Sequence, residues 1–326
     1  MSLRGAGIGS LPGSDMPAAL RLVLAETPDV VAIPELPARG VGADMVGRAA
    51  AMLSGLAVDL QPAGWRLTDN PGIDQRRALG LLRRDLDDLE EQAQGFSGVL
   101  KLAVTGPWTM AALVERPRGD KVLADHGARR DLAQSLAEGV AGLLSEMTRR
   151  LPEATWWLQV DEPLLAAVLE GRIDTASSFS KHRAVEAADA VELLDGFSSL
   201  AGTTAVHWCG APGMGLMART GFAAVSVDVA RLGSQHLDGL AAWLEAGRQV
   251  WWGTIPTEVP DRVQAVDVHA DRLSRLFEVL GLGAETLLGG LVTPACGLGG
   301  WSPLPAAEVL RQAVRVAGQV TERLHD

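Results

Sequence analysis

Short apolar runs bounded by glycine or proline recur along the chain, and longer amphipathic segments separate them. The runs lie at 5–12, 30–36, 99–108, 155–163, 202–210, 223–229, 249–256 and 287–297. They are continuous rather than alternating, which is typical of strands that are covered on both faces. The segments between them, such as "DQRRALGLLRRDLDDLEEQAQ", repeat apolar residues at helical spacing. The pattern therefore predicts alternating strands and helices, with the strands parallel.

Eight strand–helix units in a chain of 326 residues predict the α/β class and a single (β/α)8 TIM barrel. The alternative is an open, doubly wound sheet, and the count of eight runs favours the barrel. Residues 54–70 fit neither element of the repeat, and we interpret them as an inserted excursion with a short hairpin. Because no linker divides the sequence, we expect residues 1–326 to form one domain.

Composition excludes several classes of protein. A hydrophobic content of 47% is enough for a large core, and the net charge of -11 argues against a nucleic-acid partner, which would need a basic stripe. No apolar run is long enough to span a membrane, and the first residues lack a signal-peptide core. We therefore expect a cytoplasmic protein. In that reducing compartment, the two cysteines are expected to bind a metal or to be buried.

Polar residues stand at or just after the ends of the predicted strands. In a barrel these ends meet at one face, and active sites are built there. The residues concerned are Ser10, Glu35, Asp161, Glu162, His207, Cys209, Asp228, Glu258 and Cys296. Their shared position indicates one site more strongly than any single residue does.

The sequence "HWC" and the second cysteine indicate a metal site. His207 and Cys209 are two residues apart on one predicted strand, so their side chains point to the same face. Zinc takes both imidazole and thiolate ligands, and Cys296 would lie at the same mouth. Asp228 is the nearest candidate for a further ligand. Two alternatives stay open: cysteines that fill the core, and a nucleophilic Cys–His pair, which leaves the second cysteine unexplained.

Five motifs in order along the chain resemble cobalamin-independent methionine synthase. They are "GIGSLP", "TGPWT", "LQVDEP", "HWCG" and "TPACGLGG". The resemblance is to the C-terminal catalytic barrel of that family and covers nearly the whole chain, which looks like a short, single-barrel form. It implies a zinc-dependent methyltransferase that forms methionine by moving a methyl group to the thiol of homocysteine.

The resemblance also implies roles for individual residues. It assigns the zinc ion to His207, Cys209 and Cys296. The fourth ligand of the family is a glutamate, and Asp228 stands in its place here. Glu35 and Asp161 would hold the ammonium group of homocysteine, while Ser10 and the backbone around Ile8 would hold its carboxylate. Glu162 is expected to be structural.

Two departures from the family concern the methyl donor. Leu113 stands where the folate enzymes place a tryptophan that stacks on the pterin, and Glu258 lies where they carry a histidine acid. Methyltetrahydrofolate needs a general acid because its leaving group is a basic amine, whereas methylcobalamin needs none. We therefore expect a methylcorrinoid, free or on a corrinoid protein, as the donor. Glu258 is the candidate catalytic acid, provided that burial raises its pKa.

Two other functions stay open from the sequence. A zinc-dependent alkyltransferase for a different small thiol would keep the zinc site and lack the residues that clamp the amino acid. A non-catalytic relative would bind a methylated small molecule or a partner protein without turnover. The aspartate at position 228, in place of a glutamate, allows this second alternative.

Overall fold

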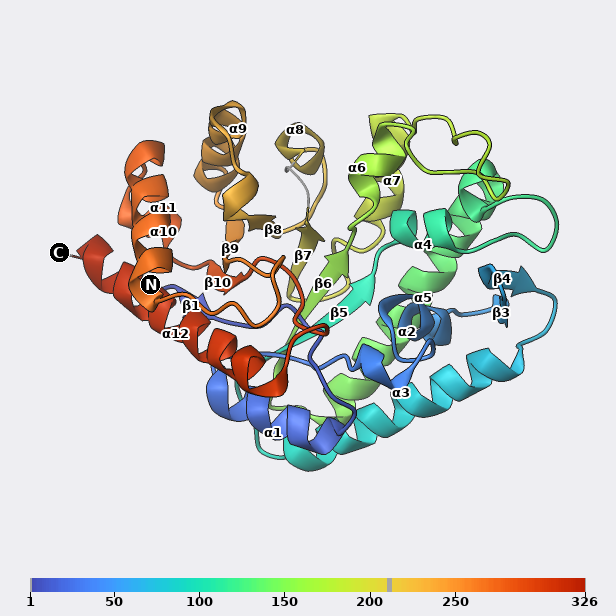
Figure 1. The fold of residues 1–326 in the computed structure, drawn as a ribbon, viewed down its shortest axis with the longest axis horizontal. Coiled ribbons are helices and arrows are strands. Elements are labelled where there is room, and N and C mark those ends of the chain that lie inside the picture. The colour runs from blue at the N-terminus through green and yellow to red at the C-terminus, as the bar shows by residue number, and fades with distance from the viewer. Residues whose placement is uncertain (1, 210–212, 326) are drawn as a thin grey trace.

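Parallel strands run through the centre of the molecule, and helices lie outside them (Figure 1). The computed structural model describes residues 2–209 and 213–325. The central sheet has eight strands in the order β1-β10-β9-β8-β7-β6-β5-β2. These strands are β1 (Arg4–Gly5), β2 (Val30–Ala32), β5 (Val99–Thr105), β6 (Thr155–Asp161), β7 (Thr203–Trp208), β8 (Ala224–Asp228), β9 (Gln249–Ile255) and β10 (Leu291–Pro294).

The ring of strands closes through residues that follow the first two strands. β1 pairs with β10 and β2 pairs with β5, and all of these pairs are parallel. Between β1 and β2, Ser10 and Glu35 form an isolated parallel bridge. Its backbone hydrogen bonds run from Leu11 N to the Glu35 oxygen (2.9 Å) and from Glu35 N to the Gly9 oxygen (3.2 Å). The predicted (β/α)8 barrel is therefore confirmed, and two predicted site residues form its seam.

Helices cover the outside of the ring. They are α1 (Met16–Glu26), α2 (Met45–Met52), α3 (Ile73–Gln92), α4 (Pro107–Leu113), α5 (His126–Arg150), α6 (Leu165–Leu169), α7 (Ala187–Asp195), α8 (Met214–Met217), α9 (Ser234–Glu245), α10 (Val266–Leu280), α11 (Ala284–Leu287) and α12 (Pro303–His325), with 3-10 turns η1 (Pro37–Arg39), η2 (Val122–Ala124) and η3 (Val229–Arg231). The last helix, α12, packs against β1, β10 and α1, which brings the end of the chain beside its beginning. Within residues 2–209 and 213–325, no helix combines the length and the apolar character that crossing a membrane requires.

The interior of the barrel holds one layer of apolar side chains contributed from all around the ring. The layer consists of Ala6, Val30, Val99, Trp157, Ala205, Ala224, Trp251 and Leu291. Trp157 and Trp251 stack with their ring centroids 5.8 Å apart, and the alanines leave the space that these two rings fill. Their sequence neighbours Trp156 and Trp252 belong to the outer core between strands and helices. Each tryptophan pair is thus divided between two faces by the period of two along a strand.

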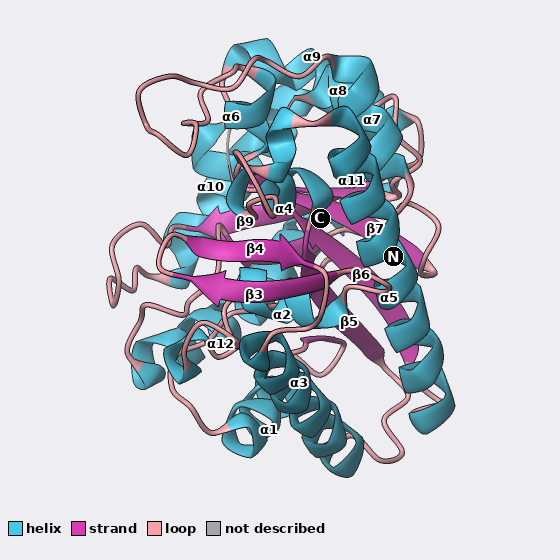
Figure 2. Cartoon of the chain, turned by 90° about the vertical axis from the view of Figure 1, so that its right-hand side faces the viewer, coloured by secondary structure: helices cyan, strands magenta, loops and turns pink. Residues whose placement is uncertain are grey.

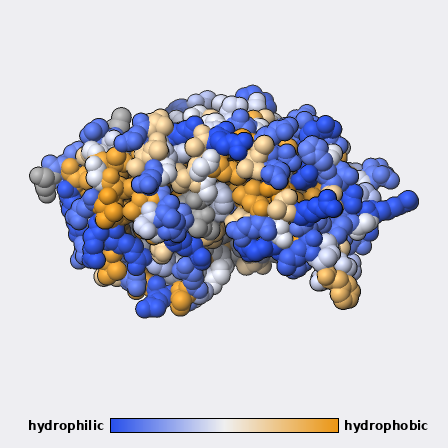
Figure 3. Space-filling model, turned by 90° about the horizontal axis from the view of Figure 1, so that it is seen from above, coloured by the Kyte–Doolittle hydropathy of each residue, from blue (hydrophilic) through white to orange (hydrophobic). Residues whose placement is uncertain are grey.

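A small antiparallel hairpin forms a separate sheet, which lies apart from the barrel strands in Figure 1 and faces the viewer in Figure 2. It consists of β3 (Ala57–Gln61) and β4 (Gly64–Thr68), within the residues that we interpreted as an excursion. Backbone hydrogen bonds of 2.8 Å join Leu67 and Trp65 of β4 to Glu115, just after α4. The outer surface, seen from above in Figure 3, is mostly hydrophilic, as the acidic composition predicts.

Several predicted strands end earlier than expected. The run 99–108 stops at Thr105 because Pro107 begins α4, and proline is favoured in the first turn of a helix. The run 287–297 shortens to Leu291–Pro294, since its first residue closes α11. The run 202–210 ends at Trp208, and its last residue, Gly210, lies outside the described residues. Periodicity located the strands, whereas their ends depended on local turns.

Candidate active site

A cavity of about 260 Å³ lies at the carboxyl ends of the strands. Its lining includes seven of the nine predicted site residues, namely Ile8, Ser10, Glu35, Asp161, His207, Cys209 and Cys296. The other two, Asp228 and Glu258, are not in the lining. The barrel therefore gathers most of the residues that the sequence placed at strand ends.

Three potential metal ligands converge at this cavity. The ligand atoms of His207, Cys209 and Cys296 all lie within 4.8 Å of one another. The Cys209 sulfur lies 3.1 Å from His207 Nε2 and 3.5 Å from the Cys296 sulfur. A tetrahedral zinc ion with bonds of about 2.1 Å to nitrogen and about 2.3 Å to sulfur would separate such ligands by roughly 3.6–3.8 Å. The donor set and its spacing therefore fit zinc, with small outward shifts of the side chains.

The imidazole of His207 is held from its far side. Its Nδ1 atom lies 2.9 Å from Ser226 Oγ on β8, so that Nε2 faces the two cysteines. Such a partner fixes the ring of a metal-binding histidine. The hydrogen bond between the thiols lowers the pKa of Cys296 to about 4 and raises the pKa of Cys209. One sulfur of the pair is therefore disposed to be a thiolate, the form that binds metal.

Asp228, the predicted fourth ligand, is not brought into this group. One of its oxygens accepts a hydrogen bond from Ala230 N (2.9 Å), and the other accepts one from Arg231 Nε (3.2 Å). The carboxylate thereby caps η3 and pairs with an arginine, which is a common use of an aspartate at the end of a strand. Burial raises the pKa of Asp228. The geometry provides three protein ligands, the number found in catalytic zinc sites.

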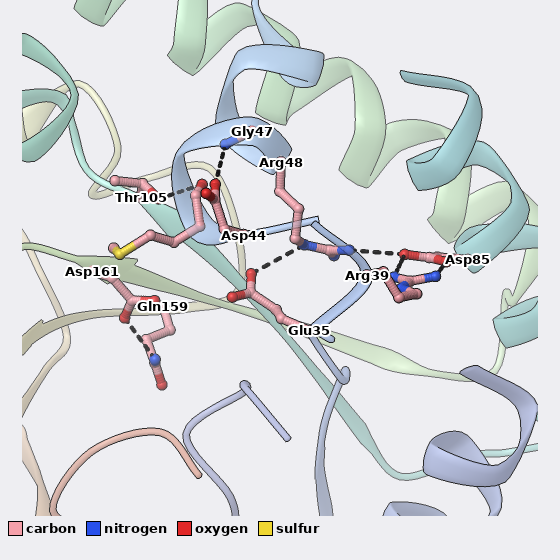
Figure 4. Close-up of polar contacts among 10 residues, drawn as sticks. Glu35, Arg39, Asp44, Gly47, Arg48, Asp85, Thr105, Gln159 and Asp161 are labelled. Atoms are coloured by element: carbon pink, nitrogen blue, oxygen red, sulfur yellow. Dashed lines mark hydrogen bonds and ion pairs between the residues drawn. The ribbon is translucent and has the colours of Figure 1, made fainter. Parts of the chain in front are cut away.

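Glu35 forms one end of a chain of buried ion pairs (Figure 4). Arg48 Nε donates to Glu35 Oε1 (3.2 Å), and Arg48 also donates to Asp85 on α3 (3.0 Å). Arg39 makes two hydrogen bonds of 2.7 Å to the same Asp85 carboxylate. Burial raises the pKa of Glu35, and the Arg48 guanidinium opposes that shift. The chain fixes the Glu35 carboxylate against α2 while leaving it in the cavity lining.

Asp161 lies at the end of β6 and receives a hydrogen bond from within the barrel. Gln159 Nε2 donates to Asp161 Oδ1 at 2.7 Å (Figure 4). Burial raises the pKa of Asp161 to about 7, although His207 and Gln159 act in the opposite direction. With Glu35, this residue gives the cavity two carboxyl groups, which suit a ligand with a positive charge.

Glu162, the neighbour of Asp161, points away from the cavity and caps α4. Its carboxylate accepts hydrogen bonds from Trp108 N (2.9 Å), Thr109 N (2.8 Å) and Thr109 Oγ1 (2.7 Å). These groups form the first turn of the helix, whose free N–H groups favour an acceptor. Burial raises the pKa of Glu162 to about 7. The expected structural role of Glu162 agrees with these contacts.

The segment from Ile8 to Ser10 lies against the loop that carries Cys296. Leu298 N donates to the Ser10 backbone oxygen at 2.8 Å. A Cβ atom on Gly297 would come within 1.9 Å of Ser10 Oγ, so only glycine allows this close approach. The first and last units of the barrel are thus packed together beside the cysteine.

Glu258 does not meet the condition on which its acid role depended. Its side chain is 53% exposed, and its nearest ionic partner is Arg231, at 4.0 Å. The burial that an acid role would require is absent at this position, because the loop after β9 leads the side chain into solvent. Leu113, at the end of α4, is also partly exposed.

Four residues of the site region were missed from the sequence. They are Asp44, Arg48, Lys101 and Gln159. Lys101 gave a signal, because it is the only charge in the apolar run "VLKLAVT". Gln159 also gave a signal, because it precedes Asp161 by two residues and therefore points to the same face of the strand. Asp44 has the sequence position of a helix cap, and it does cap α2, since its carboxylate accepts a hydrogen bond from Gly47 N at 2.7 Å.

Comparisons with known proteins agree with the fold and the motifs. A family model described as "Cobalamin-independent synthase, Catalytic domain" matches residues 91–319. Among curated proteins, none gives a significant match to this chain.

Two solved structures are similar over almost their whole length. One is a B12-independent methionine synthase from Shewanella sp. W3-18-1 in complex with selenomethionine, with a TM-score of 0.63 and 14% identity over 99% of this chain and 98% of that chain. The other is a methyltransferase from Methanosarcina mazei, with a TM-score of 0.60 and 14% identity over 96% of this chain and 94% of that chain. At these identities the likeness concerns the fold.

Proposed function

The chain belongs to the family of cobalamin-independent synthase catalytic domains, and from that premise we propose that it is a zinc-dependent methyltransferase that converts homocysteine to methionine. The observation that carries this proposal is the convergence of His207, Cys209 and Cys296 at one cavity. Two carboxyl groups, Glu35 and Asp161, line the same cavity. A soft-metal site beside an ammonium-binding pair is the arrangement that an amino acid with a thiol requires.

We propose that the two cysteines and the histidine hold zinc and leave one coordination position for the substrate sulfur. Zinc, when bound, lowers the pKa of the homocysteine thiol so that the sulfur is a thiolate at neutral pH. Ser226 orients the imidazole through Nδ1. The cysteines must be reduced, rather than joined in a disulfide, to act as thiolate ligands, so a reducing compartment such as the cytoplasm suits the site.

The rest of the cavity suits the amino-acid end of homocysteine. Glu35 and Asp161 would accept hydrogen bonds from its ammonium group, and Ser10 with the backbone around Ile8 would bind its carboxylate. The cavity of about 260 Å³ is below the roughly 300–1,000 Å³ of sites for drug-sized ligands. Its size therefore favours a small metabolite.

For the methyl donor, we propose a methylcorrinoid, free or carried by a corrinoid protein. The homocysteine sulfur would attack the methyl carbon, and the carbon–cobalt bond would break with its electron pair left on cobalt. This step needs no proton, in contrast to release of the basic amine of a folate. The exposure of Glu258 supports the proposal, because the region after β9 offers no buried acid at that position.

The test is methionine formation from homocysteine and methylcobalamin by the zinc-loaded protein, without folate. Methionine above the protein-free background, absent in the Cys209→Ala variant, would support the proposal. No methionine from methylcobalamin or methyltetrahydrofolate, despite bound zinc and homocysteine, would indicate a non-catalytic binding protein. Equal kcat/KM for homocysteine and for propane-1-thiol would indicate an alkyltransferase for a different thiol.

A further inference from the structure

One charged side chain lies inside the barrel, beneath the cavity. Lys101, on β5, is fully buried, and its ammonium group lies 5.4 Å from the centre of the Trp251 ring. Burial lowers the pKa of this lysine to about 7, and the nearby Asp161 and Glu35 oppose that shift. A buried cation is costly unless it makes strong hydrogen bonds. The hydrogen-bond partners of Lys101 therefore indicate what this buried lysine does in the barrel.

Lys101 makes two hydrogen bonds, which connect it to two residues of the cavity lining, Ile8 directly and Asp161 through Gln159. Its Nζ donates to the backbone oxygen of Ile8 at 2.8 Å. It also donates to Gln159 Oε1, and Gln159 Nε2 in turn donates to Asp161 Oδ1 at 2.7 Å. An ammonium group has donors only, so it forces the Gln159 oxygen toward itself and the amide nitrogen toward Asp161. Without the lysine, the hydrogen bond to Asp161 alone would hold the amide in this orientation.

The two partners belong to the two halves of the proposed substrate clamp. Ile8 is in the segment that would bind the carboxylate of homocysteine, and Asp161 would bind its ammonium group. Lys101 stands opposite Trp157 in the register of β5 and β6, and the Trp157 ring stacks on that of Trp251, so apolar rings surround the ammonium group. One buried ammonium group thus connects both halves from beneath.

We propose that Lys101 is a positioning residue for the amino-acid end of the acceptor, acting on Asp161 through Gln159 and on the Ile8 backbone directly. This inference rests on the proposed function, because it takes homocysteine as the ligand. Lys101 itself lies below the cavity and is absent from its lining. Lys101 fixes the positions of the Asp161 carboxylate and the Ile8 backbone and makes no hydrogen bond with the proposed zinc ligands.

The experiment is a calorimetric titration of zinc-loaded protein with L-homocysteine and, separately, with propane-1-thiol. Lys101→Met keeps the length of the side chain and removes its donors. We expect Kd for homocysteine to rise about tenfold or more, which is the usual effect of losing a hydrogen bond to a charged group. Kd for propane-1-thiol should stay within about twofold of the wild-type value, because that ligand lacks the ammonium and carboxylate groups that the clamp would bind. Zinc content should stay at that of the wild type.

Arg4→Met is the matched control. The Arg4 guanidinium lies 4.9 Å from the centre of the Trp157 ring, at the other end of the same tryptophan stack. This variant removes a cation from the stack without touching Gln159 or Ile8, so both Kd values should stay at the wild-type level. If Lys101→Met does not fold, Gln159→Met breaks the same relay and should give the same selective loss.

The outcomes separate this inference from the proposed function. Wild-type affinity for homocysteine in Lys101→Met, or equal weakening of both thiols, would overturn the positioning role while the proposed function stands. Failure of the wild-type protein to bind homocysteine would overturn the proposed function and this inference with it. A selective loss for homocysteine in Lys101→Met, shared by Gln159→Met and absent in Arg4→Met, supports it.

Discussion

The mouth of the barrel has two sides that look alike in the sequence and differ in the structure. The first, the thiol side, consists of Glu35, Asp161, His207, Cys209 and Cys296, which line one cavity. The second, the β8–β9 side, consists of Asp228 and Glu258. Asp228 caps η3 and pairs with Arg231, and Glu258 is 53% exposed. All seven residues stand at or just after the ends of predicted strands, yet only the first five come together.

A position at the end of a strand places a residue near the mouth of the barrel. The next few residues of the chain then decide whether its side chain points into the cavity or away from it. On the thiol side, the glycine at position 297 and the bridge between Ser10 and Glu35 bring chain segments close together. On the β8–β9 side, a helical turn begins directly after Asp228, and the Ala230 N–H and the Arg231 side chain of that turn donate to the carboxylate. The acidic residues of the β8–β9 side are therefore turned away from the cavity that the thiol side lines.

The strongest test of the contrast removes a ligand on the thiol side. Cys296→Ala should lose stoichiometric zinc and reduce methionine formation by more than about a hundredfold, since loss of an outer-shell partner alone costs about 10–100-fold. Metal content by atomic emission and methionine by chromatography are the measurements. Full zinc retention in Cys296→Ala would refute the shared site.

A second test concerns Glu162, the buried acid that follows Asp161 in the chain and caps α4. Burial raises the folded-state pKa of Glu162 to about 7, above the value of about 4.3 in an unfolded chain. The folded protein therefore binds this proton more tightly, and the associated stability is present below about pH 4 and lost as pH rises through about 7.

Glu162→Gln cannot lose a proton and serves as the reference for this effect. Between about pH 5 and about pH 8, the free energy of unfolding of the wild type should fall relative to Glu162→Gln by up to about 3 kcal/mol. Urea denaturation of both proteins at both pH values measures the difference. If the free energy of unfolding changed with pH in the same way in both proteins, the raised pKa of Glu162 would be contradicted.

A third test asks whether the thiol side recognises an amino acid. Asp161→Asn should raise KM for homocysteine about tenfold, because a hydrogen bond between two charged groups is lost. Zinc content and KM for propane-1-thiol should not change. An unchanged KM for homocysteine would count against the ammonium role of Asp161 and favour a different thiol as acceptor.

The smallest effect is expected on the β8–β9 side. Glu258→Gln should leave methyl transfer from methylcobalamin within about twofold of the wild type, since an exposed side chain that makes no buried contact contributes little and this donor needs no acid. Asp228→Asn should likewise retain zinc, because its oxygens are used by Ala230 and Arg231. A large loss of activity or of zinc in either variant would remove the distinction between the two sides.

The sequence predicted much of the site because its chemistry follows a simple spacing. His207 and Cys209 share a strand face, and both cysteines stand at the ends of apolar runs. Once a barrel was predicted, these three side chains were therefore expected to lie close together. Lys101, Gln159 and Arg48 were missed, because their partners are 93, 58 and 37 residues away along the chain. Contacts over such separations depend on which strands and helices become neighbours.

The sequence by its local patterns predicted eight strands, their parallel arrangement and the approximate places at which polar side chains would gather. Continuous apolar runs bounded by glycine or proline and segments with helical spacing can be recognised in the chain without its fold. Only the tertiary structure decided which of those residues face one another. The capping of η3 by Asp228, the exposure of Glu258 and the relay from Lys101 through Gln159 to Asp161 depend on turns, close packing and competition for hydrogen bonds. Those contacts exist only once the ring of strands has closed.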